Sequence, residues 1–309
     1  MKYVFGPVPS RRLGMSLGID MVPYKTCTFD CIYCECGRTT VHEAVRRRHF
    51  DSLSPVLDEV LRIIKSGRRI DYITLSGSGE PTLNVQCGEF IREVKKKTET
   101  RVAVLTNGSI LTQGNVFNEL LAADLVVPSL DAARQSTFER VNRPVKGMLV
   151  KDIAEATAEF VRAFAGEVWL EVLLVEGLND SQEDLAALSD AVMRIDPAQI
   201  QVGTVERPGA EDWARPVSNK KLEDFVAGLG PRAAVIGQPN RDFGVSTGRD
   251  ITADVLALVL RRPCTIEDIE SAVSEKRPVI IGKLRELQQA GKIIEYVHND
   301  KSFYSSKKR

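Results

Sequence analysis

The stretch CTFDCIYCEC, residues 27–36, holds four of the six cysteines of the chain, at Cys27, Cys31, Cys34 and Cys36. Cysteines gathered in one loop, rather than spread as pairs, favour a metal or catalytic site over disulfides. The first three place their thiolates within one short turn of chain, and thiolates are the usual protein ligands of iron–sulfur clusters. Three ligands would leave one iron of a four-iron cluster open to another molecule. The alternative is a structural zinc site that uses all four thiolates.

Strand-like and helix-like stretches alternate over roughly the first 240 residues of the chain. Strands are predicted at residues 16–22, 72–81, 102–108, 125–131, 168–177, 200–208 and 233–237. Helices are predicted between them at residues 54–67, 89–98, 114–122, 151–164, 181–194 and 219–229. The first helix has Ser54 as its expected N-cap and Gly67 as its expected stop.

Several of these strands are near-continuous apolar runs, such as LVVP at the start of residues 125–131. Strands buried on both faces have this composition, as in a parallel sheet that helices cover. Glycine and polar residues follow the strand ends, where parallel α/β barrels place their active sites. We therefore expect an α/β fold over residues 1–236, a parallel (β/α)6-type partial barrel.

The pattern changes after residues 237–249, a stretch rich in Gly, Pro, Asn and Asp that we interpret as a linker. Residues 250–309 predict three short helices followed by a hairpin, with His298, Asn299 and Asp300 at its turn. This order is typical of a small winged-helix domain, a variant of helix-turn-helix. Its partner classes are a protein or peptide, RNA and DNA, and its modest basic charge leaves all three open.

The bulk composition excludes several classes of protein. The chain has 42 Lys and Arg against 42 Asp and Glu, so as a whole it does not attract a polyanion. It has no run of ~18 apolar residues, so we expect no membrane span. Prolines and paired arginines interrupt the N-terminal stretch, so we expect no signal peptide there. With its clustered cysteines, the protein is expected in the cytoplasm.

The segment CTFDCIYC, residues 27–34, matches the CxxxCxxC motif of the radical S-adenosylmethionine (radical SAM) superfamily. The chain resembles that superfamily over residues 1–236. The resemblance implies that Cys27, Cys31 and Cys34 hold one 4Fe–4S cluster whose open iron binds S-adenosylmethionine (SAM). It also implies that the reduced cluster cleaves SAM to a 5′-deoxyadenosyl radical. The remaining cysteines are too few and too scattered for a second cluster.

Further residues match positions that the superfamily uses around SAM. The strand at residues 72–81 ends in GSGEP, so Gly79 and Glu80 correspond to the GGE motif, which meets the methionine amino group. Glycine lets the backbone approach a ligand closely, and a carboxylate pairs with an ammonium group. The resemblance assigns further cofactor contacts to Tyr33 near the adenine, to Ser129 and Asp131 at the ribose, and to Asn107 and Glu171. An ordinary turn or helix cap is the alternative for GSGEP, Ser129 and Asp131.

Two features leave alternatives open. Cys36 is expected not to bind the cluster and is interpreted as a spare thiol or a substrate-facing group. Arg11 and Arg12 lie in the stretch YVFGPVPSRRLG, which either forms a solvated turn that closes the bottom of the barrel or contacts an anionic substrate.

The sequence therefore supports two functions. The first is a radical SAM iron–sulfur oxidoreductase or transferase, similar to a branch loosely grouped with wyosine-forming tRNA enzymes. Its substrate would be a tRNA base, a peptide or protein side chain, or a small metabolite, and its electron donor a flavodoxin or ferredoxin. The second is an iron–sulfur redox sensor that regulates DNA binding through the winged helix. Glu80 distinguishes them, because a sensor has no use for a buried carboxylate beside an open iron.

Overall fold

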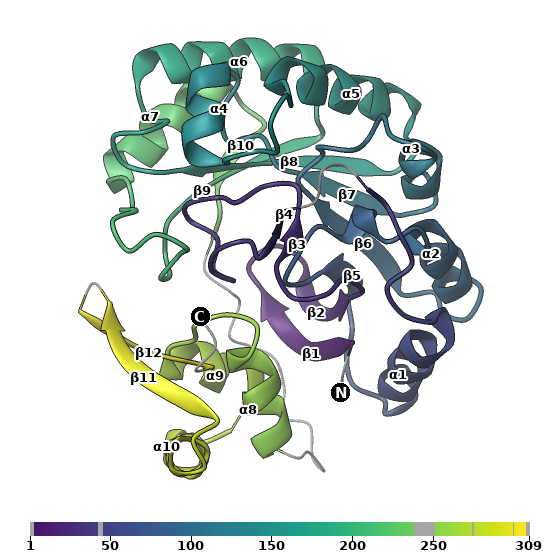
Figure 1. Ribbon diagram of the computed structural model, residues 1–309, viewed down its shortest axis with the longest axis vertical. Coiled ribbons are helices and arrows are strands. Elements are labelled where there is room, and N and C mark those ends of the chain that lie inside the picture. Colours follow the sequence, from purple (N-terminus) through teal and green to yellow (C-terminus); the bar gives the residue numbers. More distant parts are fainter. Residues whose placement is uncertain (1–2, 43–45, 238–250, 274, 299, 307–309) are drawn as a thin grey trace.

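The computed structural model describes residues 3–42, 46–237, 251–273, 275–298 and 300–306. Its centre is an eight-stranded sheet with the strand order β1-β2-β5-β6-β7-β8-β9-β10 (Figure 1). The strands of this sheet are β1 (Val4–Ser10), β2 (Gly14–Asp20), β5 (Tyr72–Ser76), β6 (Arg101–Thr106), β7 (Leu125–Pro128), β8 (Glu167–Leu174), β9 (Gln199–Thr204) and β10 (Ala233–Val235). The strands from β2 to β10 are parallel, and β1 pairs antiparallel with β2.

The sheet confirms the predicted α/β fold. All four residues of β7 are buried, as are four of the five residues of β5, because helices cover the outer face and other chain segments fill the inner face. The edge strands β1 and β10 do not pair with each other, so the sheet is an open barrel. All its parallel strands end on the same side, which gathers the loops that follow them.

Helices form an outer layer around the curved sheet (Figure 1). They are α1 (Leu53–Lys65), α2 (Cys87–Lys95), α3 (Val116–Leu120), α4 (Gln135–Val141), α5 (Val150–Ala163), α6 (Gln182–Ile195) and α7 (Asn219–Leu229), with a single 3₁₀ turn, η1 (Pro81–Leu83). Each longer helix buries one apolar stripe against the sheet, as Val56, Val60 and Ile63 of α1 do. Two short parallel strands, β3 (Thr26–Cys27) and β4 (Val41–His42), lie apart from the main sheet.

The N-terminal region differs from the sequence prediction in two ways. Helix α1 begins at Leu53 after Ser52, so Ser54 is not its N-cap, although Gly67, with φ of +72°, ends it as predicted. Strand β1 was not predicted because its prolines and glycine weaken the strand pattern. An edge strand tolerates proline, since one side of its backbone needs no sheet partner. Helix α4 was also missed, because a helix of only seven residues gives a weak periodic signal.

The C-terminal part contains α8 (Ile251–Val259), α9 (Ile266–Val273), α10 (Arg277–Gln289) and the antiparallel pair β11 (Ile293–His298) and β12 (Lys301–Ser306). Three helices and a hairpin occur in the predicted order, while the identification as a winged helix stays a prediction. The predicted linker, residues 237–249, lies outside the described residues except for its first, and Asn299 of the predicted turn lies outside them too.

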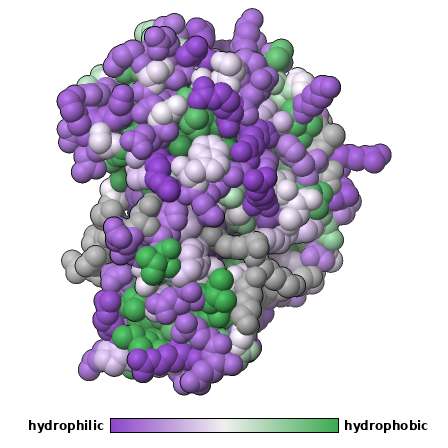
Figure 2. Space-filling view, turned by 60° about the vertical axis from the view of Figure 1, so that its left-hand side comes forward, coloured by the Kyte–Doolittle hydropathy of each residue, from purple (hydrophilic) through white to green (hydrophobic). Residues whose placement is uncertain are grey.

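The C-terminal helices pack on β1 through their own apolar core, which includes Val255, Ile269 and Ile280 and which Val8 of β1 joins. Apolar side chains also gather on the surface of this lower lobe (Figure 2), where Val297 is 71% exposed. Among the residues that the structure describes, no helix has the length and apolar character needed to cross a membrane.

Candidate functional site

The cysteine loop begins at the end of β3 and is held against the barrel by two apolar anchors. Ile32 is fully buried beside Val141 and Val205, and Phe29 packs edge to face on Phe138 with ring centroids 5.3 Å apart. The backbone N–H of Ile32 donates to the Val141 carbonyl at 3.0 Å. Burial of these two side chains therefore fixes the loop between them, which carries the thiols.

Each of the three predicted ligands has its own N–H donor, two of them from distant segments and one from the residues directly before the loop. The Asn107 side-chain amide lies 3.5 Å from Cys27 Sγ, and the Asn142 amide lies 3.5 Å from Cys31 Sγ. Lys25 Nζ lies 3.1 Å from Cys34 Sγ. Hydrogen bonds to thiolate sulfur stabilise the anionic form that binds iron and tune the cluster's reduction potential. This donor set fits a 4Fe–4S cluster.

The thiols differ in acidity. A hydrogen bond from the Cys36 thiol and the adjacent Lys25 ammonium group lower the pKa of Cys34 to about 5. Burial, with the nearby Glu80 carboxylate, raises the pKa of Cys27 to about 12, and burial raises the pKa of Cys31 as well. Cys34 is therefore the most acidic of the three thiols, and iron binding at the other two sulfurs would release protons.

A single-metal site is not formed by this loop. Within the described ranges, no three His, Cys, Asp or Glu side chains converge on a point where one metal ion could bind. The four-thiolate zinc alternative needs such convergence, because zinc draws its ligands into one tetrahedron. A cubane cluster spreads its thiolates over separate iron corners and does not need it.

Glu80 is buried and held by four donors. Its Oε1 accepts hydrogen bonds from the backbone N–H and hydroxyl of Thr82 and from the hydroxyl of Thr106, and its Oε2 accepts from the N–H of Asn107 at 2.8 Å. Its own N–H donates to the Thr26 carbonyl, directly before Cys27. The carboxylate therefore ties the turns after β5 and β6 to the start of the cysteine loop. Contact with a methionine ammonium group stays a prediction.

Two glycines allow the cysteine loop to approach the barrel. A Cβ at Gly79 would collide with the Thr26 carbonyl oxygen, and a Cβ at Gly209 would lie 2.8 Å from Tyr33 Cα. Both obstacles are backbone atoms, which cannot rotate away as a side chain does. Gly209, in the loop after β9, was not singled out from the sequence.

Gly209→Ala is therefore expected to push the cysteine loop out of place. We expect a loss of about 1–3 kcal/mol in the free energy of unfolding, from the overpacking, and a lower iron content after reconstitution. Gly282→Ala is the matched control: no other group lies within 4 Å of its added Cβ, and alanine favours helix α10. Urea denaturation and iron analysis test both variants. Equal iron in the two would contradict this role of Gly209.

Tyr33 and Asp131 contact each other directly. The Tyr33 hydroxyl donates to Asp131 Oδ2, which also accepts from the Asn142 amide at 2.6 Å, and the N–H of Leu173 donates to Oδ1 at 2.9 Å. Burial raises the pKa of the Asp131 carboxyl to about 6 in spite of these bonds. Asp131 therefore positions Tyr33 and Asn142 beside Cys31. A contact with ribose stays a prediction.

Ser129 and Glu171 lie on neighbouring strands at the same edge of the barrel. They are paired residues of a parallel bridge between the end of β7 and β8. The Glu171 carboxylate forms an ion pair of 2.6 Å with Arg12, so the N-terminal turn reaches into this region. Of the seven predicted cofactor residues, Tyr33 belongs to the cysteine loop and Gly79, Glu80, Asn107 and Asp131 contact it or the residue directly before it, whereas Ser129 and Glu171 pair with each other on the neighbouring strands.

The cysteine loop is also tied to the C-terminal helices. Glu35, between Cys34 and Cys36, pairs with Arg207 at 3.1 Å and with Arg262 at 3.8 Å. Arg207, whose side chain is 7% exposed, also binds Asp268 of α9 at 2.8 Å. This network, Glu35–Arg207–Asp268 with Arg262, links three segments far apart in the sequence.

The sequence match supports the class of protein that this site suggests. Residues 21–188, more than half of the chain, match the radical SAM superfamily model. The chain belongs to the radical SAM superfamily. The family implies the two predicted cofactors, a 4Fe–4S cluster and SAM, and the thiols with their N–H donors fit this implication. Membership of a wyosine branch stays a prediction.

Three relatives illustrate the match. A protein of Helicobacter pylori called UPF0026 protein is 33% identical over 86% of this chain and 86% of its own length. A protein of Brachyspira hyodysenteriae called GTPase Obg is 34% identical over 96% of this chain, but the chain spans only 44% of that protein. A probable dual-specificity RNA methyltransferase of Prochlorococcus marinus is 26% identical over 54% of this chain and 49% of its own length.

Solved structures confirm the fold. A radical SAM methyltransferase from Sphaerobacter thermophilus superposes with a TM-score of 0.55 at 19% identity, covering 77% of this chain and 69% of that one. SuiB of Streptococcus suis, solved with SAM bound, superposes with a TM-score of 0.52 at 13% identity, covering 69% of this chain and 49% of that one. At these identities the likeness concerns the fold alone.

Proposed function

We propose that this chain is a radical SAM enzyme in which Cys27, Cys31 and Cys34 hold one 4Fe–4S cluster and SAM binds at the open iron. The observation that carries the proposal is the donor set at the three sulfurs. Asn107 and Asn142 reach them from distant segments, and Lys25 does so from the stretch directly before the cysteine loop. A loop that only packed against the barrel would not require an N–H donor at each of these sulfurs.

When bound, the two cofactors supply a 5′-deoxyadenosyl radical, which abstracts a hydrogen atom from the substrate. The protein's own residues hold and shield this chemistry. Lys25, which is 2% exposed, places a positive charge beside Cys34 and favours an electron-rich cluster. Glu80 holds the turn that contains Gly79 in place through its hydrogen bonds. Gly79 lies so close to the Thr26 carbonyl that a residue with a side chain would not fit at this position.

The substrate, the partners and the cellular location belong to the proposal. A tRNA base, a peptide or protein side chain, and a small metabolite are the candidate substrate classes, and the winged helix is proposed to dock a tRNA or a peptide or protein substrate. A cytoplasmic flavodoxin or ferredoxin is the proposed electron donor. The match to an RNA methyltransferase supports an enzyme and leaves the substrate class open.

The test is SAM cleavage by the whole chain. The protein is reconstituted anaerobically with iron and sulfide, reduced with dithionite and mixed with SAM. We expect about four irons per chain and formation of 5′-deoxyadenosine, which requires dithionite. A full complement of iron with no 5′-deoxyadenosine, and with a cluster spectrum that SAM does not change, would contradict the enzyme and favour the redox-sensing regulator.

A further inference from the structure

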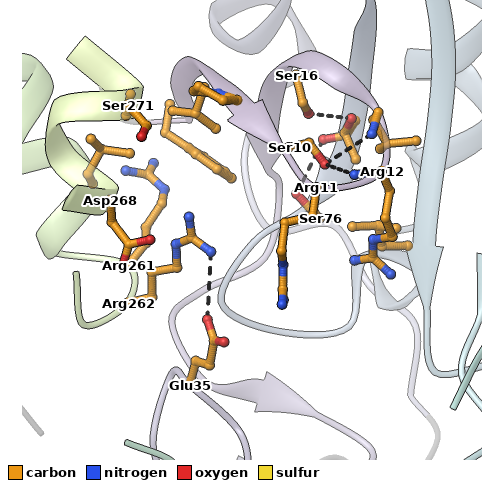
Figure 3. Close-up of a pocket in the computed structure, with 18 of the residues that line it drawn as sticks. Ser10, Arg11, Arg12, Ser16, Glu35, Ser76, Arg261, Arg262, Asp268 and Ser271 are labelled. Carbon is orange, nitrogen blue, oxygen red and sulfur yellow. Dashed lines mark hydrogen bonds and ion pairs between the residues drawn. The ribbon is translucent and has the colours of Figure 1, made fainter. Parts of the chain in front are cut away.

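A cavity of about 340 Å³ lies between the barrel and the C-terminal helices. The turn between β1 and β2 and the strand ends Ser76 and Gly77 line one side, and residues of α8 and α9 line the other (Figure 3). Cys36, two residues after the proposed ligand Cys34, also lines it. The cavity therefore reaches the cysteine loop, and its size is at the lower end of the range for small-molecule sites.

The lining is rich in arginine. Five arginines and three carboxylates line the cavity, and four of the arginines have acidic partners. Arg11 pairs with Glu206, Arg12 with Glu171, Arg207 with Glu35 and Asp268, and Arg262 with Glu35. These pairs neutralise one another's charge, so they shape the walls more than they attract a ligand.

Arg261 is the exception. Within the part of the chain that the structure describes, no carboxylate lies within ion-pair distance of it, although Asp20 and Glu59 are near enough to affect it. Its Nη1 donates to the Ala257 carbonyl, its guanidinium lies 4.6 Å from the centre of the Phe5 ring, and its Nε is buried without a partner. Burial lowers the pKa of Arg261, which is the mark of a cation that lacks a sufficient counter-charge.

Hydroxyl groups complete the polar lining. Ser10 Oγ accepts hydrogen bonds from the backbone N–H groups of Arg12 and Leu13, at 3.3 and 3.2 Å, which leaves its proton for another acceptor. Ser271 lines the cavity from α9, on the same side as Arg261 (Figure 3). A guanidinium without a carboxylate partner, in a cavity that also carries hydroxyl groups, is complementary to a carboxylate or a phosphate.

We propose that this cavity binds the substrate and that the substrate is a small molecule whose carboxylate or phosphate group is held by Arg261. The inference rests on the proposed function, since it names the substrate class of that enzyme. The N-terminal arginine turn forms one wall of this site through Arg11 and Arg12, whose charges are balanced by Glu206 and Glu171. The inference also gives the C-terminal helices a direct part in substrate binding, because they supply the anchoring cation.

The test is calorimetric binding of inorganic phosphate and of succinate to the reconstituted full chain. We expect one of the two anions to bind with a stoichiometry near one, and which anion binds distinguishes a phosphate from a carboxylate substrate. Arg261→Gln is expected to weaken binding about tenfold or more, because a charge-assisted hydrogen-bond pair is lost. Arg261→Lys keeps the positive charge but not the planar guanidinium group, so this variant should lose less affinity for the anion than Arg261→Gln.

Arg232→Gln is the matched control, because Arg232 is half exposed and pairs with Asp196 outside the cavity. It should bind the anion as the natural chain does. The inference is overturned if neither anion binds the natural chain, if Arg261→Gln and Arg261→Lys both bind as tightly as the control, or if SAM displaces the anion. The last result would assign Arg261 to the cofactor's carboxylate.

Calorimetry needs no turnover, so the two proposals can fail separately. A chain that forms 5′-deoxyadenosine but binds neither anion refutes the inference and keeps the proposed function. A chain that binds an anion through Arg261 but forms no 5′-deoxyadenosine keeps the anion site and refutes the enzyme.

Discussion

With alanine at Cys27, Cys31 and Cys34 together, the chain is expected to bind no four-iron cluster and to form no 5′-deoxyadenosine. The three thiols are the proposed protein ligands, and the groups around them, Asn107 and Asn142, are amides that contact sulfur through N–H. No neighbouring amide can replace a thiolate as an iron ligand. Iron and sulfide analysis, the visible absorbance of the cluster and chromatography of the SAM reaction measure the three expected losses.

Cys36→Ala is the control for this experiment. Cys36 lies in the same loop and its thiol contacts both Cys34 and, at 3.4 Å, the carbonyl of Arg261, but it stands outside the three-cysteine motif. We expect Cys36→Ala to keep its iron and to form 5′-deoxyadenosine. Equal loss in the control and the triple variant would mean that all four thiols are ligands, and a triple variant that kept its cluster would refute the assignment.

The parts of this site that the sequence predicts are those encoded by local spacing. Cys27, Cys31 and Cys34 lie within one loop, and Gly79 and Glu80 directly follow a strand, so neighbouring residues identify them. The parallel sheet is predictable for a similar reason, because apolar runs that alternate with amphipathic helices leave few other arrangements. Asp131 was also found, since it ends a predicted strand.

The parts that the sequence does not predict depend on contacts between distant segments. Asn142 is an ordinary helix-end residue until it meets Cys31 and Asp131. Lys25 is close to Cys34 in sequence, but nothing in the sequence shows that its buried ammonium group lies beside that sulfur. Gly209 carries no local signal, because its obstacle is the backbone of Tyr33, more than 170 residues earlier. Such residues are identified only when the fold brings the segments together.

Arg207→Met is expected to destabilise the chain by about 3 kcal/mol and to loosen the C-terminal helices from the barrel. Removing one partner of a buried ion pair leaves the other charges uncompensated, at a typical cost of about 3–5 kcal/mol. Here the lower end applies, because Glu35 and Asp268 are 31% and 20% exposed and regain some hydration. Urea denaturation measures the loss, and hydrogen exchange locates it in α9 and in the cysteine loop.

Arg277→Met provides the matched control. Arg277 also contacts two carboxylates, Glu267 at 3.0 Å and Glu270 at 3.2 Å, but its side chain is 49% exposed. An exposed pair contributes about 0–1 kcal/mol, so the control should change stability little. If the two variants lost the same stability, burial of Arg207 would not be the cause of its effect.

The double variant Arg207→Met with Asp268→Leu tests whether the network connects the cluster loop to the C-terminal helices. Once both charges are gone, no carboxylate of α9 is left unpaired, so the double variant should lose less than the sum of the two single variants. The Glu35 side of the network remains broken, so hydrogen exchange in the cysteine loop should stay fast even where α9 recovers. If hydrogen exchange slowed in both α9 and the cysteine loop, the ion pair of Glu35 with Arg262 would be sufficient to hold the cysteine loop in place.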